Sequence, residues 1–393
     1  MKTSLYDTSW TVYSIPKVTP SLSKLLSAPA ATPQARDKRR EQLASHAESF
    51  REYLDECRPR HEREDEKASL GGLKYSTWTR LDNILDRDER PDSHAPQVGK
   101  KRRLEHEDNR VYSTALVASL AYEKGTFKFI IYTTSAASTA RSSKRRRTAS
   151  PTSQSTATPS TDDTAILLSK SSPATLKRFT TYLSDRFSVD AIHPLALSSL
   201  FLQSSLERYV SAVPSALLGQ VRLTLPFSRP IAPDLKSLEI AVPRETTARF
   251  ARAIASQRGR SSPRQIGGEK KLYMHHLADF ILDKTGLSIP VIRNVPGVTE
   301  GEGKWDGDSQ HDANPARVSK ISTACFALSA ECRVKFDSNA VEAAVGVEGV
   351  QGDGDGDGAE NCVTSANRNL LAELVDEARQ QARDERPSSD SGG

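Results

Sequence analysis

The spacing of apolar residues between positions 172 and 336 changes along the chain, and this change limits the possible folds more than any other feature. Four segments repeat apolar residues every three to four positions, as amphipathic helices do: 173–187, 194–213, 244–257 and 269–284. Two others, 221–227 and 238–242, alternate apolar with polar residues, which is the period of half-buried strands. Helices, a hairpin, helices and a last strand, in this order, predict an α+β fold with a curved, mixed or antiparallel sheet and packed helices.

The last strand of this region is predicted over Ala324–Phe336, where the alternation is longest. Its even-numbered residues are apolar, whereas its odd-numbered residues are polar from Ser329 onward. Thirteen residues of strand extend about 43 Å, which is longer than a typical strand. At the edge of a sheet such a strand needs cover, because its unpaired backbone groups bind other strands.

Composition predicts four segments along the chain: an N-terminal strand, charged helical insertion and hairpin over 1–134, a disordered basic Ser/Thr linker over 135–172, an α+β domain with a dimerisation sheet over 173–338, and an acidic flexible tail over 339–393. In the first segment, residues 36–56 carry a narrow apolar stripe that predicts a weakly docked helix. Residues 58–110 are mostly charged and predict a partly disordered insertion, with Trp78 and Leu81 as an anchor. The hairpin is predicted over 111–134.

Charge is unevenly distributed along the 393 residues, whose formal net charge is +5. The last 93 residues carry 9 Lys+Arg against 18 Asp+Glu, so the first 300 residues are basic. A basic body with an acidic tail favours a nucleic-acid or chromatin environment, although solvated surface explains the same pattern. The four cysteines form no C-x-x-C pair, and neither a signal peptide nor a membrane span is evident, which predicts a soluble intracellular protein with free thiols.

Two runs of four basic residues are predicted to direct nuclear import, because such runs remain exposed and are read by import receptors or phosphate backbones. They are Lys100, Lys101, Arg102 and Arg103, and Lys144, Arg145, Arg146 and Arg147. The second run precedes Thr148 and Ser150-Pro151, a proline-directed phosphorylation context in which a phosphate would offset the neighbouring positive charge. The alternative interpretation is a merely solvated linker.

A third basic cluster is distributed along two predicted helices and the segment that connects them, and few acidic residues lie near it. Its members are Arg244, Arg249, Arg252, Arg258, Arg260, Arg264, Lys270 and Lys271. Cationic groups held on one face bind phosphates, and Arg249 and Arg252 are three positions apart, so they share a helix face. The cluster predicts weak nucleic-acid contact, and a solvated connector remains the alternative.

No motif for catalysis, a cofactor or a metal is complete. Gly301-Glu-Gly303 begins like a dinucleotide fingerprint but lacks its third Gly. The Asp/Gly repeat at 353–358 begins like an EF-hand loop, but Thr364 occupies the position that needs a bidentate Glu. Adjacent His275 and His276 point in different directions on a helix. We therefore expect a protein that is not an enzyme, without cofactor, metal or small-molecule substrate and without membrane contact.

Several stretches together resemble the centromere protein L family. The opening Trp10–Ser14 (WTVYS) is similar to the family's first strand, and FSVDAIHPLALSSLFL at 187–202 resembles its central segment. Leu238-Glu239-Ile240 with the helix after it, the segment 272–280 and the terminal alternation at 326–336 occur in the family's order. The match covers roughly residues 5–18, 111–134 and 175–338. The charged insertion, the linker and the acidic tail depart from the vertebrate pattern and look like a filamentous-fungal version.

The resemblance implies a non-enzymatic scaffold subunit of the constitutive centromere-associated network, in the inner kinetochore at the centromere. It implies a heterodimer with centromere protein N that engages the CENP-A nucleosome or centromeric DNA, beside other inner-kinetochore subunits, in chromosome segregation. In the family, the C-terminal part contacts the partner by sheet extension, which agrees with the long alternation. The expected interface residues are Phe326, Leu328, Ser329, Glu331, Arg333 and Lys335. The alternative function is that of a standalone nuclear DNA- or RNA-binding regulator.

Overall fold

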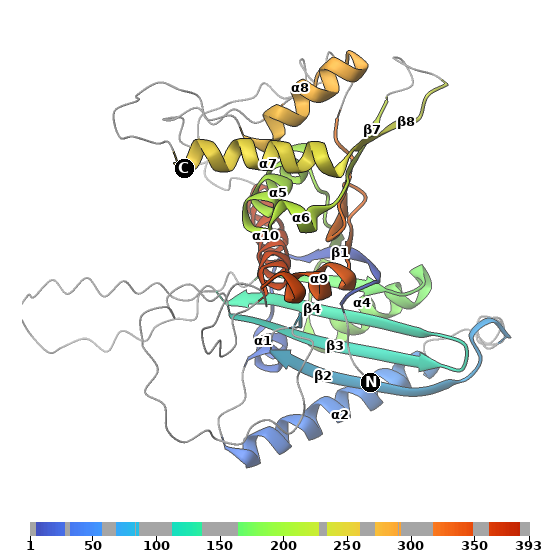
Figure 1. The fold of residues 1–393 in the computed structure, drawn as a ribbon. Helices are drawn as coiled ribbons and strands as arrows, with labels where there is room; N and C mark the ends of the chain where they lie inside the picture. The colour runs from blue at the N-terminus through green and yellow to red at the C-terminus, as the bar shows by residue number, and fades with distance from the viewer. Residues whose placement is uncertain are drawn as a thin grey trace, which may run out of the picture. The chain divides into compact units, whose positions relative to one another are not determined.

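The computed structural model describes residues 5–27, 32–56, 68–82, 84–85, 112–135, 164–227, 234–259, 272–289, 291, 317–348 and 361–385 (Figure 1). They form two compact units. The first comprises residues 11–195 and the chain from 372 onward, and the second comprises residues 5–10 and 196–371. Helices and antiparallel sheets occur in both, which confirms the α+β class.

The first unit is built on an antiparallel sheet with the strand order β2-β3-β4-β5-β1, in which β6 also pairs with β1. Its strands are β1 (Ser9–Ile15), β2 (Leu73–Asp82), β3 (Tyr112–Tyr122), β4 (Thr126–Ser135), β5 (Ala165–Lys170) and β6 (His193–Pro194). Its helices are α1 (Pro20–Leu26), α2 (Pro33–Glu56) and α4 (Pro173–Phe187). The predicted hairpin is confirmed as β3 and β4.

An aromatic core holds α2 and α4 against this sheet. Phe179 of α4 stacks on Phe129 of β4 with ring centroids 4.1 Å apart, and Phe50 of α2 packs edge-on against Phe179 at 5.3 Å. Trp78 of β2 lies 6.2 Å from the ring of Phe187. All five side chains are buried, so the weak docking expected for α2 is wrong: its stripe of Leu43, Ala47, Phe50 and Leu54 is part of the core. Figure 1 shows α2 lying beside β2.

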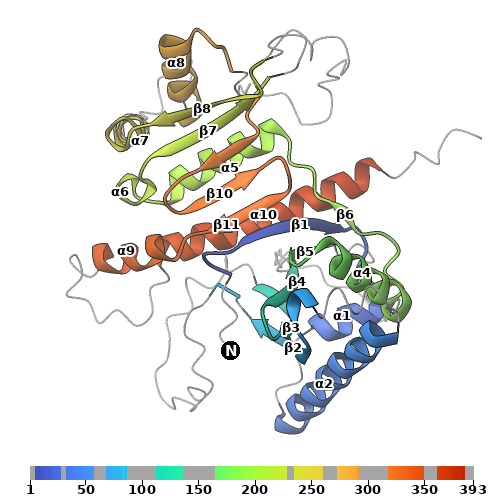
Figure 2. The same ribbon diagram turned by 90° about the vertical axis from the view of Figure 1, so that its right-hand side faces the viewer.

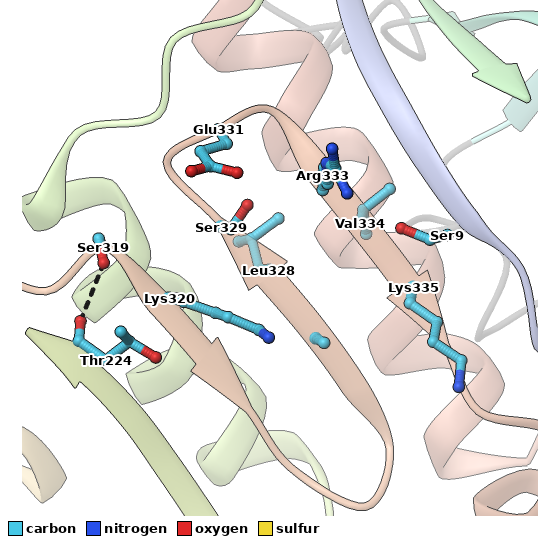
Figure 3. Close-up of a pocket in the computed structure, with 11 residues that line it drawn as sticks. Ser9, Thr224, Ser319, Lys320, Leu328, Ser329, Glu331, Arg333, Val334 and Lys335 are labelled. Carbon is cyan, nitrogen blue, oxygen red and sulfur yellow. Dashed lines mark hydrogen bonds between the residues drawn. The ribbon is translucent and has the colours of Figure 1, made fainter. Parts of the chain in front are cut away.

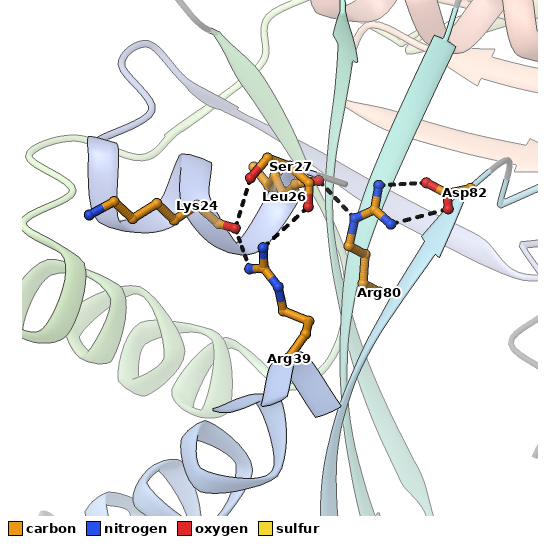
Figure 4. A network of polar contacts seen from close by, with 6 residues as sticks. All are labelled: Lys24, Leu26, Ser27, Arg39, Arg80 and Asp82. Atoms are coloured by element: carbon orange, nitrogen blue, oxygen red, sulfur yellow. Dashed lines mark hydrogen bonds and ion pairs between the residues drawn. The ribbon is translucent and has the colours of Figure 1, made fainter. Parts of the chain in front are cut away.

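Two arginines stabilise the C-terminal end of α1 (Figure 4). Arg39 donates to the backbone carbonyls of Lys24 and Ser27, and Arg80 donates to that of Leu26. Arg80 Nε lies 2.8 Å from the Leu26 oxygen, and its Nη2 lies 2.6 Å from Asp82 Oδ1. Positive groups at a helix C-terminus satisfy orphan carbonyls and complement the helix dipole. Burial, followed by the nearby Arg80 charge, lowers the pKa of the Arg39 guanidinium.

The second unit has an antiparallel sheet with the order β11-β10-β9-β7-β8 (Figure 2). Its strands are β7 (Val221–Pro226), β8 (Ser237–Val242), β9 (Lys320–Ser322), β10 (Phe326–Ser329) and β11 (Arg333–Phe336). Its helices are α5 (Ser199–Ala212), α6 (Ser215–Leu218), α7 (Arg244–Gly259), α8 (Tyr273–Thr285) and α9 (Ser338–Glu348), and α10 (Cys362–Asp384) begins in it.

The predicted strand Ala324–Phe336 is wrong as a single element. Residues 330–332 form a turn, and β10 pairs antiparallel with β11 across it. Cys332 has φ of 60°, and this left-handed residue reverses the chain. The strand β10 also pairs with β9, so it is an interior strand rather than an edge.

Several predicted boundaries also differ. The strand β2 lies within the expected insertion 58–110, and β5 lies within the expected linker 135–172. Every residue of β5 before Lys170 is buried, because both faces of the sheet are covered there. The helix α4 belongs to the first unit, since Phe179 packs on its sheet, whereas the sequence placed it in 173–338.

The tail expected over 339–393 contains α9 and α10, and α10 is not detached from the fold. Its buried side chains are Val363, Ala366, Leu370, Leu371, Leu374, Val375 and Ala378. The flexibility expected for the tail is therefore wrong over 361–385, because this apolar stripe is covered.

We expect Leu371→Ala to lower the free energy of unfolding by about 2–5 kcal/mol, because Leu371 is fully buried. The measurement is chemical denaturation beside Gln380→Ala, an exposed position on the same helix. Equal stability of the two variants would show that α10 does not pack as described.

Ser188 ends α4 in the left-handed conformation, with φ of 55° and an exposed side chain. Because Gly has no Cβ to strain this conformation, Ser188→Gly should raise the free energy of unfolding by about 1 kcal/mol. Ser188→Ala is the matched control and should bring no gain. A loss of stability in the Gly variant would contradict the prediction.

Candidate functional site

The sheet of the second unit has one apolar and one polar face, set by the pairing of its strands. Leu223, Ile321, Leu328 and Val334 pair in a cross-strand row, and all four are buried. The next row is Thr224, Lys320, Ser329 and Arg333, which point to the opposite face because neighbouring strand residues alternate. The apolar face packs on α5, where Tyr209 lies 4.4 Å from the Phe326 ring.

The structure separates the six expected interface residues into two groups. Phe326 and Leu328 are 2% and 1% exposed and belong to the core of the second unit. Glu331, Arg333 and Lys335 are exposed, on the turn and on β11. Ser329, Glu331, Arg333 and Lys335 border a surface hollow, to which Leu328 also contributes although it is nearly buried.

A hollow of about 330 Å³ lies over the polar face (Figure 3). Small side chains form much of its lining, and longer charged ones surround them. The lining residues are Ser9, Thr224, Ser319, Lys320, Ala327, Leu328, Ser329, Glu331, Arg333, Val334 and Lys335. Figure 3 shows Ser329 between Lys320, on the neighbouring β9, and Arg333, on β11. The hollow is basic, because its lining carries three cationic side chains, Lys320, Arg333 and Lys335, and one carboxylate, Glu331.

Sequence reasoning missed Lys320, because β9 is only three residues long and follows a long polar segment. A strand this short has too few positions to show alternation. The pairing of β9 with both β7 and β10 makes it a strand, and this pairing is not visible in the local sequence.

The outer edge of β8 is the second exposed feature of this sheet. The Phe227 N–H donates to the Lys236 carbonyl at 3.1 Å, so this pair is hydrogen-bonded. Hydrogen-bonded and non-hydrogen-bonded pairs alternate along antiparallel strands. The backbone N–H and C=O groups of Ser237, Glu239 and Ala241 therefore point away from β7, and all three side chains are exposed. Among the described residues, no strand pairs with this edge.

The helix α7 carries the described part of the expected nucleic-acid cluster. Arg244, Arg249 and Arg252 are exposed on it, and the Arg249 guanidinium lies 5.8 Å from the Phe250 ring centroid. Arg252 Nε donates to the Ala248 carbonyl at 3.3 Å. The side chain of Arg258 lies outside the described residues, as do Arg260, Arg264, Lys270 and Lys271 and both four-residue basic runs.

Burial disfavours the thiolate form of two cysteines in the second unit. Burial raises the pKa of the Cys325 thiol to about 11, and its Sγ lies 3.3 Å from the Leu217 carbonyl oxygen. Burial, with the nearby Glu331 charge, also raises the pKa of Cys332. No group of three metal-ligating side chains gathers within the described ranges. No described helix is long and apolar enough to cross a membrane.

The comparisons with known proteins agree with the resemblance found in the sequence. The family model described as centromere protein L matches residues 4–379, which is nearly the whole chain. A search of individually curated proteins gives no match. The chain therefore belongs to the centromere protein L family, whose members are kinetochore proteins of the centromere in the nucleus.

Proposed function

We propose that this chain is a non-enzymatic inner-kinetochore subunit that pairs with centromere protein N and helps to link CENP-A chromatin to the kinetochore. The observation that supports the pairing is the unpaired edge of β8. Its outward backbone groups can form a new antiparallel ladder with a partner strand, as in other complexes formed by sheet extension. Family membership supports the kinetochore setting.

The β8 edge suits strand addition because a partner would find both polar and apolar contacts there. Ser237, Glu239 and Ala241 each offer an N–H and a C=O, and each new backbone hydrogen bond contributes about 0.5–1.5 kcal/mol net. Leu235, just before the strand, is 45% exposed and would be covered by an added strand. The proposal therefore moves the strand contact from Ala324–Phe336 to β8.

The polar hairpin residues lie elsewhere on the same sheet. In the order β8-β7-β9-β10-β11, the turn at Glu331 and the strand carrying Arg333 lie several strands from the free edge. Strands are about 4.8 Å apart, so one added strand at β8 does not reach them. We assign the strand contact to β8 and treat the polar face as a separate surface.

Ala241→Pro tests the edge. The Ala241 N–H points out of the sheet, so the substitution removes a donor for the partner strand without breaking a bond to β7. We expect binding of centromere protein N to weaken at least about tenfold, or ~1.4 kcal/mol, in a titration of the purified proteins. The melting temperature of the variant should stay within a few degrees of wild type.

Ala241→Thr is the matched control, because it keeps the N–H and favours a strand. It should bind like wild type. If the folded Pro variant also binds like wild type, β8 is not the pairing edge. A Pro variant that is unfolded would instead show that the Ala241 N–H points into the sheet, and this contradicts the register.

A second contact, with DNA, is favoured by the exposed arginines of α7. In this proposal Arg249 and Arg252 bind phosphates of centromeric DNA next to the nucleosome, sharing one helix face. The same contact would serve a standalone nuclear regulator, and pairing with centromere protein N distinguishes the two functions.

We expect replacement of both Arg249 and Arg252 by Ala to flatten the salt dependence of duplex DNA binding by about one unit of log–log slope per lost phosphate contact. The measurement is a salt titration of the full chain. Arg222→Ala, an exposed arginine paired with Glu239, is the control and should keep the wild-type slope. Identical slopes for all three proteins would leave the α7 cluster as solvated surface.

A further inference from the structure

The register of three strands brings a hydroxyl and two cations together on the polar face. Ser329 of β10 is directly opposite Lys320 of β9 on one side and Arg333 of β11 on the other. Adjacent strands lie about 4.8 Å apart, so the two cationic side chains begin about 10 Å from each other with the serine between them. Figure 3 shows this arrangement within the hollow.

The serine at the centre carries a covered hydroxyl group. Ser329 is 8% exposed, and its hydroxyl oxygen has no hydrogen-bond partner among the described residues. A covered hydroxyl without a partner destabilises the folded state, so natural folds rarely keep one without a reason. A ligand oxygen that accepts from this hydroxyl would remove that destabilisation.

The positive charge around the serine exceeds the negative charge, and it is not held in ion pairs. No ion pair within the described ranges joins Lys320, Arg333 or Lys335 to a carboxylate. On the same face, by contrast, Arg222 pairs with Glu239 at 3.4 Å. The unpaired charge is thus confined to the hollow and does not extend across the sheet.

We propose that this hollow binds a phosphorylated serine or threonine carried by an extended segment of a partner protein. The phosphoryl oxygens would accept from the Ser329 hydroxyl and from the Lys320 and Arg333 side chains, in charge-assisted hydrogen bonds. Lys335 lies two rows further along on the same face, two residues from Arg333, and would pair with an acidic residue of the same segment. This surface is separate from the β8 edge, so the proposal does not depend on pairing there.

A peptide fits better than a nucleic acid on three grounds. The charge is local, whereas a duplex presents a continuous line of phosphates. Glu331 borders the hollow and would repel a second phosphate near the turn. The floor consists of small side chains such as Ala327 and Ser329, which leaves room for an extended backbone but offers no aromatic ring on which bases could stack.

The chain's own proline-directed site is a poor occupant. Ser150 follows Lys144–Arg147 by only three residues, and these four positive charges would be repelled by the hollow. The occupant is therefore a segment with acidic residues around its phosphorylated side chain, supplied by another protein.

The test uses the full chain and fluorescent pools of short acidic peptides with a fixed central phosphoserine, beside the same pools with serine. We expect the phosphoserine pool to bind at least about tenfold more tightly, since charge-assisted bonds are the stronger ones. Lys320→Gln and Arg333→Gln should each lose most of this preference, and Ser329→Ala should reduce it. Arg222→Ala should leave it unchanged.

Competition with inorganic phosphate and with duplex DNA distinguishes a phosphorylated peptide from the two other phosphate-bearing ligands that the hollow could bind. Millimolar phosphate should displace the peptide only weakly. A phosphate affinity equal to that of the peptide would overturn the proposal in favour of a free-phosphate site. Displacement by DNA that disappears in the Lys320 and Arg333 variants would overturn it in favour of nucleic acid. Equal binding of the two peptide pools by folded protein, judged by an unchanged melting temperature, would also overturn it.

Discussion

One tyrosine side chain connects three elements of the second unit, and the polarity of its sheet depends on that contact. The Tyr209 ring packs 4.4 Å from Phe326, and its hydroxyl donates to Asn367 Oδ1 at 2.8 Å. Burial raises the pKa of Tyr209 well above its ordinary value, so the hydroxyl stays protonated and remains a donor. This packing covers the apolar face of β10 with α5 and α10, and the alternation of the strands then places the charged residues on the other face.

The local signals in the sequence were sufficient wherever one short segment determines the structure. Ser172 accepts from the Thr175 N–H at 3.2 Å and α4 starts at Pro173, so a Ser-Pro pair marks the first turn of the helix expected from the apolar spacing of 173–187. Gly286 ends α8 in the left-handed conformation, which Gly adopts without strain because it has no Cβ. Each of these features is decided within one turn of helix.

The error at Ala324–Phe336 has a geometric cause. A turn of three residues pairs Ser329 with Arg333, four positions apart, so odd residues stay opposite odd residues. The alternation of apolar and polar residues is therefore unbroken through the turn, and a hairpin has the same pattern as one long strand. Cys332 takes the position where Gly or Asn would have marked the turn, so the sequence contains no signal to separate the two structures. The tail was misjudged for a related reason, because its acidic composition hides the buried stripe of α10.

The corrected topology changes what the candidate surfaces can recognise. An edge such as that of β8 presents backbone groups, so it can bind almost any strand of matching length and owes its specificity to flanking side chains such as Leu235. A face such as the hollow presents fixed charges and a single hydroxyl, so it distinguishes a phosphorylated segment from its unmodified form. Contacts through the edge depend weakly on salt, because they are backbone hydrogen bonds and apolar burial, whereas contacts through the face weaken as salt rises. Two surfaces on one sheet can thus combine a constitutive partner with a regulated one, without either contact using the other's atoms.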